Sequence, residues 1–440
     1  MTALGDTSGV AQHLSALITC RTISEPDHHD PQEFARLRGL LRDMYPATHR
    51  ATERIELPGG SLLHIWRGRR AERPLLLMAH HDVVPAEASR WAHDPFGGDI
   101  SESSVHGRGA LDDKGALVCL LEAVEALAVQ DFVPDHDIYV FSGADEETDG
   151  NGARLAAKVL HDCGVRPWLV SDEGGAVVPP GLIPGQDAPI AMVALAEKGT
   201  VDVDVVARSE GGHSSVPLRG GATERLAEAV LRISRHEPQT RVSAPVRAML
   251  AAVAEHFPPT FAGLATAPEA TISSALSDGG PELAALIRST MVVTRMTGSP
   301  ADNVLATRAS ANVNARLAPG DDKVQLESRL STLLDGLDIS IDDVRGDDPS
   351  PTAAGTGAQW DLLTAAITHL DPDVRVVPYL QSGATDSRHF TSISDAVHRF
   401  SPLTMDSSQR AAIHSHDEHV TVESLARGAS FYHALMTLPH

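Results

Sequence analysis

Histidines and carboxylates follow three short apolar segments whose composition is typical of buried strands. Residues 75–79 (LLLMA) run into His80-His81-Asp82, residues 137–142 (DIYVFS) lead to Asp145-Glu146-Glu147, and residues 168–170 (WLV) lead to Asp172-Glu173. In open α/β sheets, ligands bind beyond the carboxyl ends of the strands, so we expect these clusters to converge in space. Imidazole and carboxylate are typical zinc ligands, so the pattern raises the hypothesis of a metal site.

Two further clusters lie where helices are expected to begin. The loop 107–115 (GRGALDDKG) contributes Asp112 and Asp113, and residues 414–419 (HSHDEH) contribute imidazoles just before the last helix. Each cluster alone has an ordinary explanation, because carboxylates after strands often cap helices and charged loops are often simply solvated. Several such clusters, all at the ends of expected elements, favour a functional site over unrelated loops.

The elements that must position these residues change character along the chain. Up to residue 198, strand-like and helix-like segments alternate, which indicates an α/β domain with a largely parallel sheet. After Gly199 the strictly alternating segment TVDVDVVAR opens a unit of strands and helices typical of an α+β fold, and α/β character returns near Asp347. A Pro/Ala-rich stretch at 240–287 gives no ordered pattern. We expect helices at 115–128, 153–163, 223–235, 323–334, 360–370 and 422–438, and strands at 290–296, 310–317, 338–344, 374–379 and 396–400.

The simplest architecture is one α/β domain interrupted by a smaller inserted domain. Residues 1–198 and 348–440 would form a mainly parallel-sheet catalytic domain with helices on both faces. Residues 199–347 would form an inserted α+β lid or dimerisation domain. A chain of 440 residues suits two such units, since a domain typically has ~100–200 residues.

Composition excludes some partners and suggests a compartment. The formal charge, 36 basic minus 59 acidic residues, is −23, which argues against nucleic acid and anionic membranes as partners. No apolar run approaches the ~18 residues of a membrane span, and the first residues have no secretory pattern. Cys20, Cys119 and Cys163 form no CxxC motif, and we expect Cys119 and Cys163 to be buried in helices. A soluble cytoplasmic protein is the expectation.

Nine segments, in order, resemble the zinc-dependent peptidase family of aminoacylase, carboxypeptidase and succinyl-diaminopimelate desuccinylase. The resemblance covers nearly the whole chain, and DEGG followed by Ala196-Glu197-Lys198-Gly199 looks most similar to the carboxypeptidase S-like branch. The segments are AHHDVVP (79–85), WAHDPFGGDI (91–100), GRGALDDKG (107–115), ADEETDGNGA (144–153), SDEGG (171–175), GGHSSVP (211–217), ADNVLA (301–306), the Arg316 segment and IHSHDEHV (413–420).

The resemblance implies a site for two zinc ions, with cobalt or manganese as possible substitutes. It assigns His80 and Glu173 to one zinc, with Asp172 as an alternative to Glu173, and it assigns Glu147 and His414 to the other. Asp112 would bridge both ions, and the peptide bond Asp112–Asp113 would be cis. The remaining assigned residues are Asp82, which would orient His80, and Glu146, which would act as general acid and base.

The resemblance also places functional residues in the insert and predicts a homodimer. His213 would cross the dimer interface and stabilise the oxyanion in the partner's site. Asn303, Arg316 and Gly383 would bind substrate, with Arg316 pairing with a substrate carboxylate. Ordinary alternatives exist for each of these, such as a turn histidine, a surface strand arginine and a turn glycine.

The expected activity is hydrolysis of an amide bond in a small peptide or an N-acyl amino acid. Two cations would lower the pKa of a water towards ~7, and Glu146 would accept its proton. A non-catalytic metal-dependent binding protein on the same fold is the alternative, but none of the expected ligands is missing. The sequence has no GxSxG, nucleotide-binding or HExxH motif, which argues against other enzyme classes.

Overall fold

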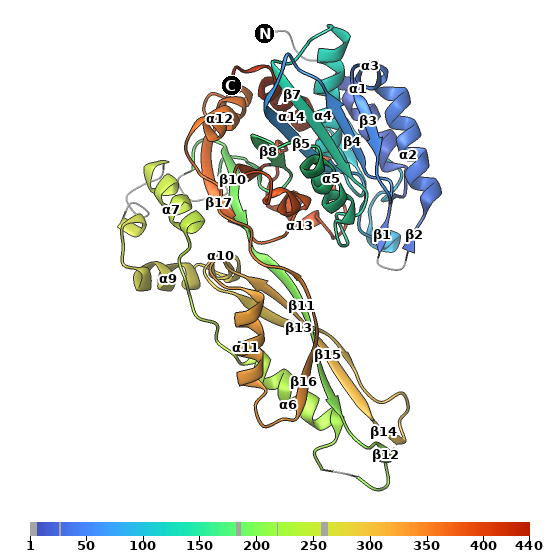
Figure 1. The fold of residues 1–440 in the computed structure, drawn as a ribbon, viewed down its shortest axis with the longest axis vertical. Coiled ribbons are helices and arrows are strands. Elements are labelled where there is room, and N and C mark those ends of the chain that lie inside the picture. The colour runs from blue at the N-terminus through green and yellow to red at the C-terminus, as the bar shows by residue number, and fades with distance from the viewer. Residues whose placement is uncertain (1–6, 26–27, 182–185, 218, 257–262) are drawn as a thin grey trace.

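The computed structural model describes residues 7–25, 28–181, 186–217, 219–256 and 263–440. Figure 1 shows an elongated molecule with a large sheet and its helices at one end and a smaller sheet at the other. The chain leaves the larger unit through β10 (Ile190–Glu197) into β11 (Gly199–Arg208) and returns after β16 (Ile339–Asp347). The chain thus passes between the two units next to Glu197 and next to Asp347.

A nine-stranded mixed sheet with a parallel centre forms the larger unit. Strands β18, β8, β5 and β7 lie side by side in that order and run parallel to one another. Beyond β7, strands β4 and β3 follow, each antiparallel to the strand before it. On the other side, β10 pairs with β18, β17 and β9. The bounds are β3 (Glu53–Glu56), β4 (Leu62–Trp66), β5 (Arg70–His80), β7 (His136–Gly143), β8 (Leu169–Asp172), β9 (Ala176–Val178), β17 (Arg375–Gln381) and β18 (Val397–Arg399).

Helices cover both faces of this sheet, as predicted. Leu75 and Leu77 of β5 pack into a core with the helices of one face, while Leu76 and Met78 pack into a second core with those of the other face. This explains why LLLMA is apolar without interruption, since a strand buried on both faces has no polar side. The first face carries α1 (Thr7–Ile18), α2 (Pro31–Met44), α4 (Lys114–Val129), α12 (Ala358–Leu370) and α14 (Val422–Thr437), and the second carries α5 (Asn151–Asp162) and the 3₁₀ helix η2 (Asp386–Phe390).

The inserted unit is a four-stranded antiparallel sheet covered by helices on one face. The strand order is β13-β15-β11-β16, and α6 and α11 pack on the side chains of Val201, Val203 and Val205. The intervening residues of β11 point to the other face, so the strict alternation in the sequence is confirmed. The remaining bounds are β12 (Gly212–His213), α6 (Ala222–Ser234), β13 (Thr290–Thr297), β14 (Val304–Leu305), β15 (Arg308–Leu317) and α11 (Lys323–Leu333).

The stretch that the sequence left without order contains three described helices, α7 (Ala244–His256), α9 (Glu269–Asp278) and α10 (Pro281–Leu286). They pack against β10 and β17 of the larger sheet, because Val246 and Ile272 share a core with Ile190 and Val377. These helices therefore cover an edge of the large sheet, although they lie within the predicted insert.

The two cysteines that were expected to be buried differ in their exposure. Cys119 is buried as predicted, but Cys163 is exposed because it caps the solvent end of α5, so that expectation was wrong. Among the described residues, no helix is long and apolar enough to span a bilayer. The short elements are β1 (Ser24–Glu25), β2 (His28–His29), α3 (Pro46–Ala51), η1 (Ala88–Arg90), β6 (Ser104–His106), α13 (Ser407–Ala412) and β19 (His419–Thr421).

Candidate metal centre

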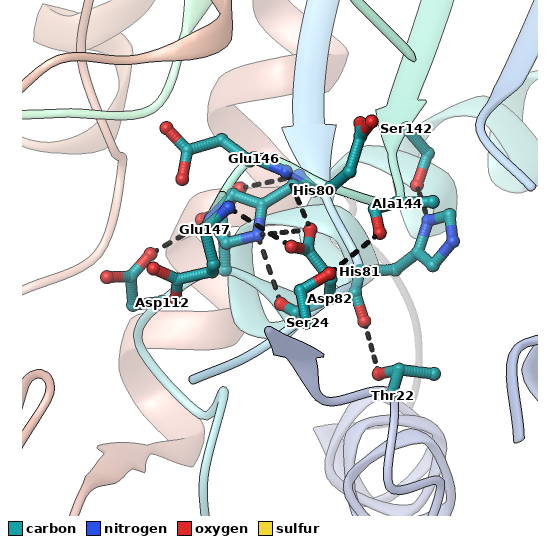
Figure 2. A network of polar contacts seen from close by, with 12 residues as sticks. Thr22, Ser24, His80, His81, Asp82, Asp112, Ser142, Ala144, Glu146 and Glu147 are labelled. Carbon is teal, nitrogen blue, oxygen red and sulfur yellow. Dashed lines mark hydrogen bonds and ion pairs between the residues drawn. The ribbon is translucent and has the colours of Figure 1, made fainter. Parts of the chain in front are cut away.

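The predicted clusters converge at the carboxyl ends of three neighbouring parallel strands. β5 ends at His80, β7 ends at Gly143 just before the Glu146–Glu147 pair, and β8 ends at Asp172 next to Glu173. Figure 2 shows the residues that follow β5 and β7 gathered around His80, with Asp112 approaching from a separate loop. The sheet topology, rather than nearness in the chain, brings these residues together.

Asp112 belongs to two groups of potential metal ligands. One group is His80, Asp112 and Glu173, the other is Asp112, Glu147 and His414, and the ligand atoms within each lie within 4.8 Å of one another. Oδ1 of Asp112 is 3.0 Å from Nε2 of His80, while Oδ2 is 3.2 Å from Nε2 of His414. Each oxygen of this carboxylate thus faces a different imidazole, which is the arrangement a bridging ligand needs.

Asp82 is fully buried behind the first group and contacts three of its neighbours. Its Oδ1 lies 3.3 Å from Nδ1 of His80 and accepts the N–H of Glu146 at 3.2 Å, while Oδ2 accepts the N–H of Glu147 at 3.1 Å. Figure 2 shows Asp82 between His80 and the Glu146–Glu147 loop. His81 faces the other way, with Nδ1 2.7 Å from the Ser142 hydroxyl. One carboxylate therefore orients both an imidazole and a loop.

Asp172 and Glu173, which the sequence left as alternatives, have different surroundings. The carboxylate of Asp172 accepts the N–H of Glu173 at 2.9 Å and that of Ser387 at 2.8 Å. Glu173 is the one that joins the ligand group of His80 and Asp112. Asp172 therefore holds the loop, and Glu173 is the one of the pair whose oxygens could hold a metal.

The histidines near the C-terminus also separate. His414 lies 3.0 Å from the Glu147 carboxylate, and its backbone has a positive φ of 56°. His416 contacts the Ser415 hydroxyl, and His419 stacks on His106 at 5.4 Å between ring centroids. Of these three, only His414 belongs to a candidate ligand group among the described residues.

The loop that carries Asp112 has a conformation that the resemblance implied. The Asp112–Asp113 peptide bond is cis. The buried carboxylate of Glu418 accepts the N–H groups of Leu111 and Asp112 at 2.7 and 3.1 Å. Sequence reasoning gave Glu418 no role of its own, although its spacing of four residues from His414 was part of the motif.

Crowded carboxylates perturb the pKa values of the site. Burial raises the pKa of Glu146 and of Glu173 well above the usual range, and neighbouring carboxylates raise both further. Burial lowers the pKa of His80, but hydrogen bonds with Asp112 and Asp82 outweigh it and raise the pKa well above its ordinary value. Burial raises the pKa of Asp112, yet hydrogen bonds with His414 and His80 hold it below the usual range.

This donor set fits divalent metal ions. Two imidazoles and three carboxylates offer the nitrogen and oxygen ligands that zinc takes, and cations among them would relieve the repulsion between the acids. The second group has one histidine and two carboxylates, like the first, so the two positions are chemically similar.

His213 and Asn303, which were predicted in the insert, do not reach this site within one chain. His213 and Asn303 are adjacent, since Ser214 donates its N–H to the carbonyl of Asn303, and both are exposed. Figure 1 shows β12 and β14, which carry this region, at the end of the molecule farthest from the large sheet. Arg316 lies on β15 with Nη1 2.6 Å from the Thr200 hydroxyl, and Gly383 lies in the loop after β17.

Comparisons with known proteins identify the class. The model of peptidase family M20/M25/M40 matches residues 76–438, so the chain belongs to this family. A probable carboxypeptidase S-like 2 from Dictyostelium discoideum is 32% identical, over 97% of this chain and 84% of its own length. The human N-fatty-acyl-amino acid synthase/hydrolase PM20D1 is 30% identical, over 83% of this chain and 74% of its own.

A solved structure supports the fold. The M20 family metallo-carboxypeptidase Sso-CP2 from Sulfolobus solfataricus superposes with a TM-score of 0.71 at 15% identity, over 97% of this chain and 98% of that one. The predicted family, the resemblance to carboxypeptidase S-like proteins and the α/β fold with an insert are therefore confirmed. The protein is a hydrolase of amide bonds from a family of metallopeptidases, and its relatives act on peptides or N-acyl amino acids.

Proposed function

We propose that the protein is a dinuclear zinc hydrolase that cleaves the amide bond of a small peptide or an N-acyl amino acid. The observation that carries this proposal is the position of Asp112, whose two oxygens face His80 and His414 separately. Glu173 would complete one position and Glu147 the other. Bound zinc would polarise the scissile carbonyl and activate a water at neutral pH.

Glu146 is the residue that moves the proton in this proposal. Its neighbour Glu147 belongs to a ligand group, whereas the Glu146 carboxylate has no hydrogen bond within the described residues. Asp82 accepts the backbone N–H of Glu146, which fixes the backbone position from which the Glu146 side chain extends. A half-buried carboxylate with a raised pKa is suited to accept a proton from water and pass it to the leaving nitrogen.

Arg316 of the insert is the proposed partner of a carboxylate on the substrate. Arg316 is half-buried, and its guanidinium has one hydrogen bond, to Thr200, within the described residues, so it can pair with a substrate carboxylate. The names of the relatives, carboxypeptidase S-like protein and N-fatty-acyl-amino acid synthase/hydrolase, support a substrate that ends in a free carboxylate. Gly383 would contact the same substrate, and Asn303, which lies beside His213, would reach it from a second copy of the chain.

A homodimer would bring His213 to a site. β13 is an edge strand of the small sheet and exposes Val292 and Met296, which are 55% and 52% exposed, and Val216 beside His213 is 66% exposed. Exposed apolar side chains on an open edge are typical of a surface that pairs with another chain. A second copy would cover them, and its His213 would supply the oxyanion donor that a single chain does not place near the metals.

The test is Glu146→Gln with the metal content measured. We expect turnover to fall by about 10²–10⁴-fold, the usual range for a general base, with zinc content unchanged at two ions per chain. The matched control is Asp149→Asn on the same loop, an exposed carboxylate outside both ligand groups, which should keep both turnover and zinc. Near-normal turnover of Glu146→Gln would remove Glu146 from the mechanism, and fewer than two zinc ions per wild-type chain would contradict the dinuclear site.

A further inference from the structure

One buried carboxylate binds the whole loop that carries Asp112. Glu418 has 0% exposure, and its four acceptor contacts all come from residues 108–112. Oε1 accepts the N–H of Leu111 at 2.7 Å and of Asp112 at 3.1 Å. Oε2 accepts the N–H of Gly109 at 3.1 Å and Nη1 of Arg108 at 2.7 Å. Hydrogen bonds to a charged acceptor are among the stronger ones in proteins, so this loop is held closely to Glu418.

Arg108, on the Asp112 loop, in turn binds the backbone of the segment that carries His414 and Glu418. Its Nη2 donates to the carbonyl of Ser415 at 2.6 Å, the residue next to His414. Its guanidinium also lies over the Trp91 ring, 5.2 Å from the centroid, and the side chain is 2% exposed. The segments 107–112 and 414–418 are therefore tied together by a buried ion pair and by bonds from each member to the other segment's backbone.

The two candidate metal positions depend on this connection to different degrees. His80 and Glu173 follow strands of the large sheet, so their backbone positions are set by the sheet. His414 instead lies in a loop, its side chain is 52% exposed, and its ring contacts within the described residues are Asp112 and Glu147. A shift between the two tied segments would move His414 relative to Asp112, whereas His80 and Glu173 would keep their places.

We propose that Glu418, together with Arg108, is a positioning residue that sets His414 against Asp112 and so forms the second metal position. The inference rests on the proposed dinuclear site and names the residues that assemble its less rigid half. Glu418→Gln keeps the size of the side chain but replaces one oxygen with an NH₂ group. That group would face the N–H donors of either the Leu111–Asp112 pair or the Gly109–Arg108 pair, so half of the contacts would turn repulsive.

The experiment titrates zinc into the metal-free protein against a chelator of known affinity and resolves the two binding steps. The matched control is Glu125→Gln, because Glu125 also accepts two backbone N–H groups, those of Ala47 and Thr48, but lies on α4 outside both ligand groups. We expect two tight ions in the wild type and in Glu125→Gln. In Glu418→Gln we expect one ion with unchanged affinity and a second weakened by about 10–100-fold, the usual loss when a supporting residue is removed.

A second readout separates positioning from simple structural support. Excess zinc should restore the turnover of Glu418→Gln towards that of the wild type with KM unchanged, because the second position is weakened but not removed. Two ions at wild-type affinity in Glu418→Gln would overturn the inference, and so would equal weakening of both. If Glu418→Gln does not fold by circular dichroism, Arg108→Lys decides, since lysine keeps the charge but cannot reach both Glu418 and the Ser415 carbonyl. Fewer than two ions in the wild type would instead contradict the proposed dinuclear function.

Discussion

Replacing Asp82 with asparagine should weaken metal binding without removing any metal ligand. The carboxylate is fully buried and contacts the Nδ1 of His80 and the N–H groups of Glu146 and Glu147. Asparagine offers one oxygen and one NH₂ group, so at least one of the two N–H donors would face another donor. A buried group without its partner costs about 1–3 kcal/mol of stability.

The expected loss of zinc affinity is estimated separately from the loss of stability. Loss of an outer partner of a metal-binding histidine typically costs about 10–100-fold in affinity or activity, which corresponds to about 1.4–2.7 kcal/mol. Zinc affinity measured by chelator competition and thermal unfolding of the metal-free protein separate the two effects. We expect both to fall in Asp82→Asn.

Asp137 provides a matched control at the opposite end of the sheet. It is 4% exposed, accepts the N–H of Gly68 at 2.8 Å and pairs with Nη1 of Arg67 at 2.9 Å. Asp137→Asn should therefore lose a similar amount of stability while zinc affinity stays at the wild-type value. If Asp82→Asn binds zinc and turns over substrate like the wild type, Asp82 does not orient the site. If both variants lose zinc affinity equally, the loss reflects the fold and the reasoning fails.

Three further outcomes follow from the same geometry. If His213 serves the partner's site, mixing inactive Glu146→Gln with inactive His213→Ala should restore about a quarter of wild-type activity per chain. Half of randomly formed dimers are mixed, and each mixed dimer has one complete site out of two. No recovery of activity in dimers shown to exchange subunits would refute the crossing. Amidating the substrate's C-terminus should reduce kcat/KM sharply in the wild type but little in Arg316→Met. The control variant Arg308→Met, at the exposed end of β15, should behave like the wild type. Equal wild-type rates for the acid and the amide would exclude Arg316 as the carboxylate partner. Burial lowers the pKa of His398 from 6.5 to about 4, so between these pH values the unfolded chain binds more protons than the folded one. The free energy of unfolding should therefore decrease as the pH is lowered from 6.5 towards 4, and it should decrease less steeply in His398→Phe. Identical slopes of the unfolding free energy against pH in the two proteins would contradict this.

The sequence was sufficient for much of the fold because its patterns follow burial directly. LLLMA is apolar throughout since both faces of β5 are covered, and TVDVDVVAR alternates since one face of β11 is covered. The stretch 240–287 gave no pattern because its helices are short and bury residues against strands far away in the chain. Cys163 was misjudged because its apolar neighbours belong to the buried face of α5, while the residue itself lies at the exposed helix end.

The site was predictable only as far as residue types and strand ends determine it. The sequence placed acids and imidazoles at one edge of the sheet, but it could not decide between the neighbours Asp172 and Glu173. That choice depends on where β8 ends and on the turn that follows, where Gly174 and Gly175 both have positive φ. The proposed crossing of His213 to a second copy rests on the resemblance, because an interface between copies leaves no spacing pattern within one chain.

The buried and half-buried acids of this site divide into two kinds by what their oxygens accept. Asp82, Asp172 and Glu418 accept backbone N–H groups, so their negative charge is stabilised by donors of the chain itself and they hold loops in place. Glu146 and Glu173 have no side-chain hydrogen bonds within the described part of the chain, and those of Asp112 and Glu147 lead only to histidines. Burying a carboxylate without such bonds is costly, so the second kind persists only where a cation or a proton offsets the cost. This division matches the proposed roles, with Glu418 among the acids that hold loops and Glu146 and Glu173 among those proposed to act on metal or proton.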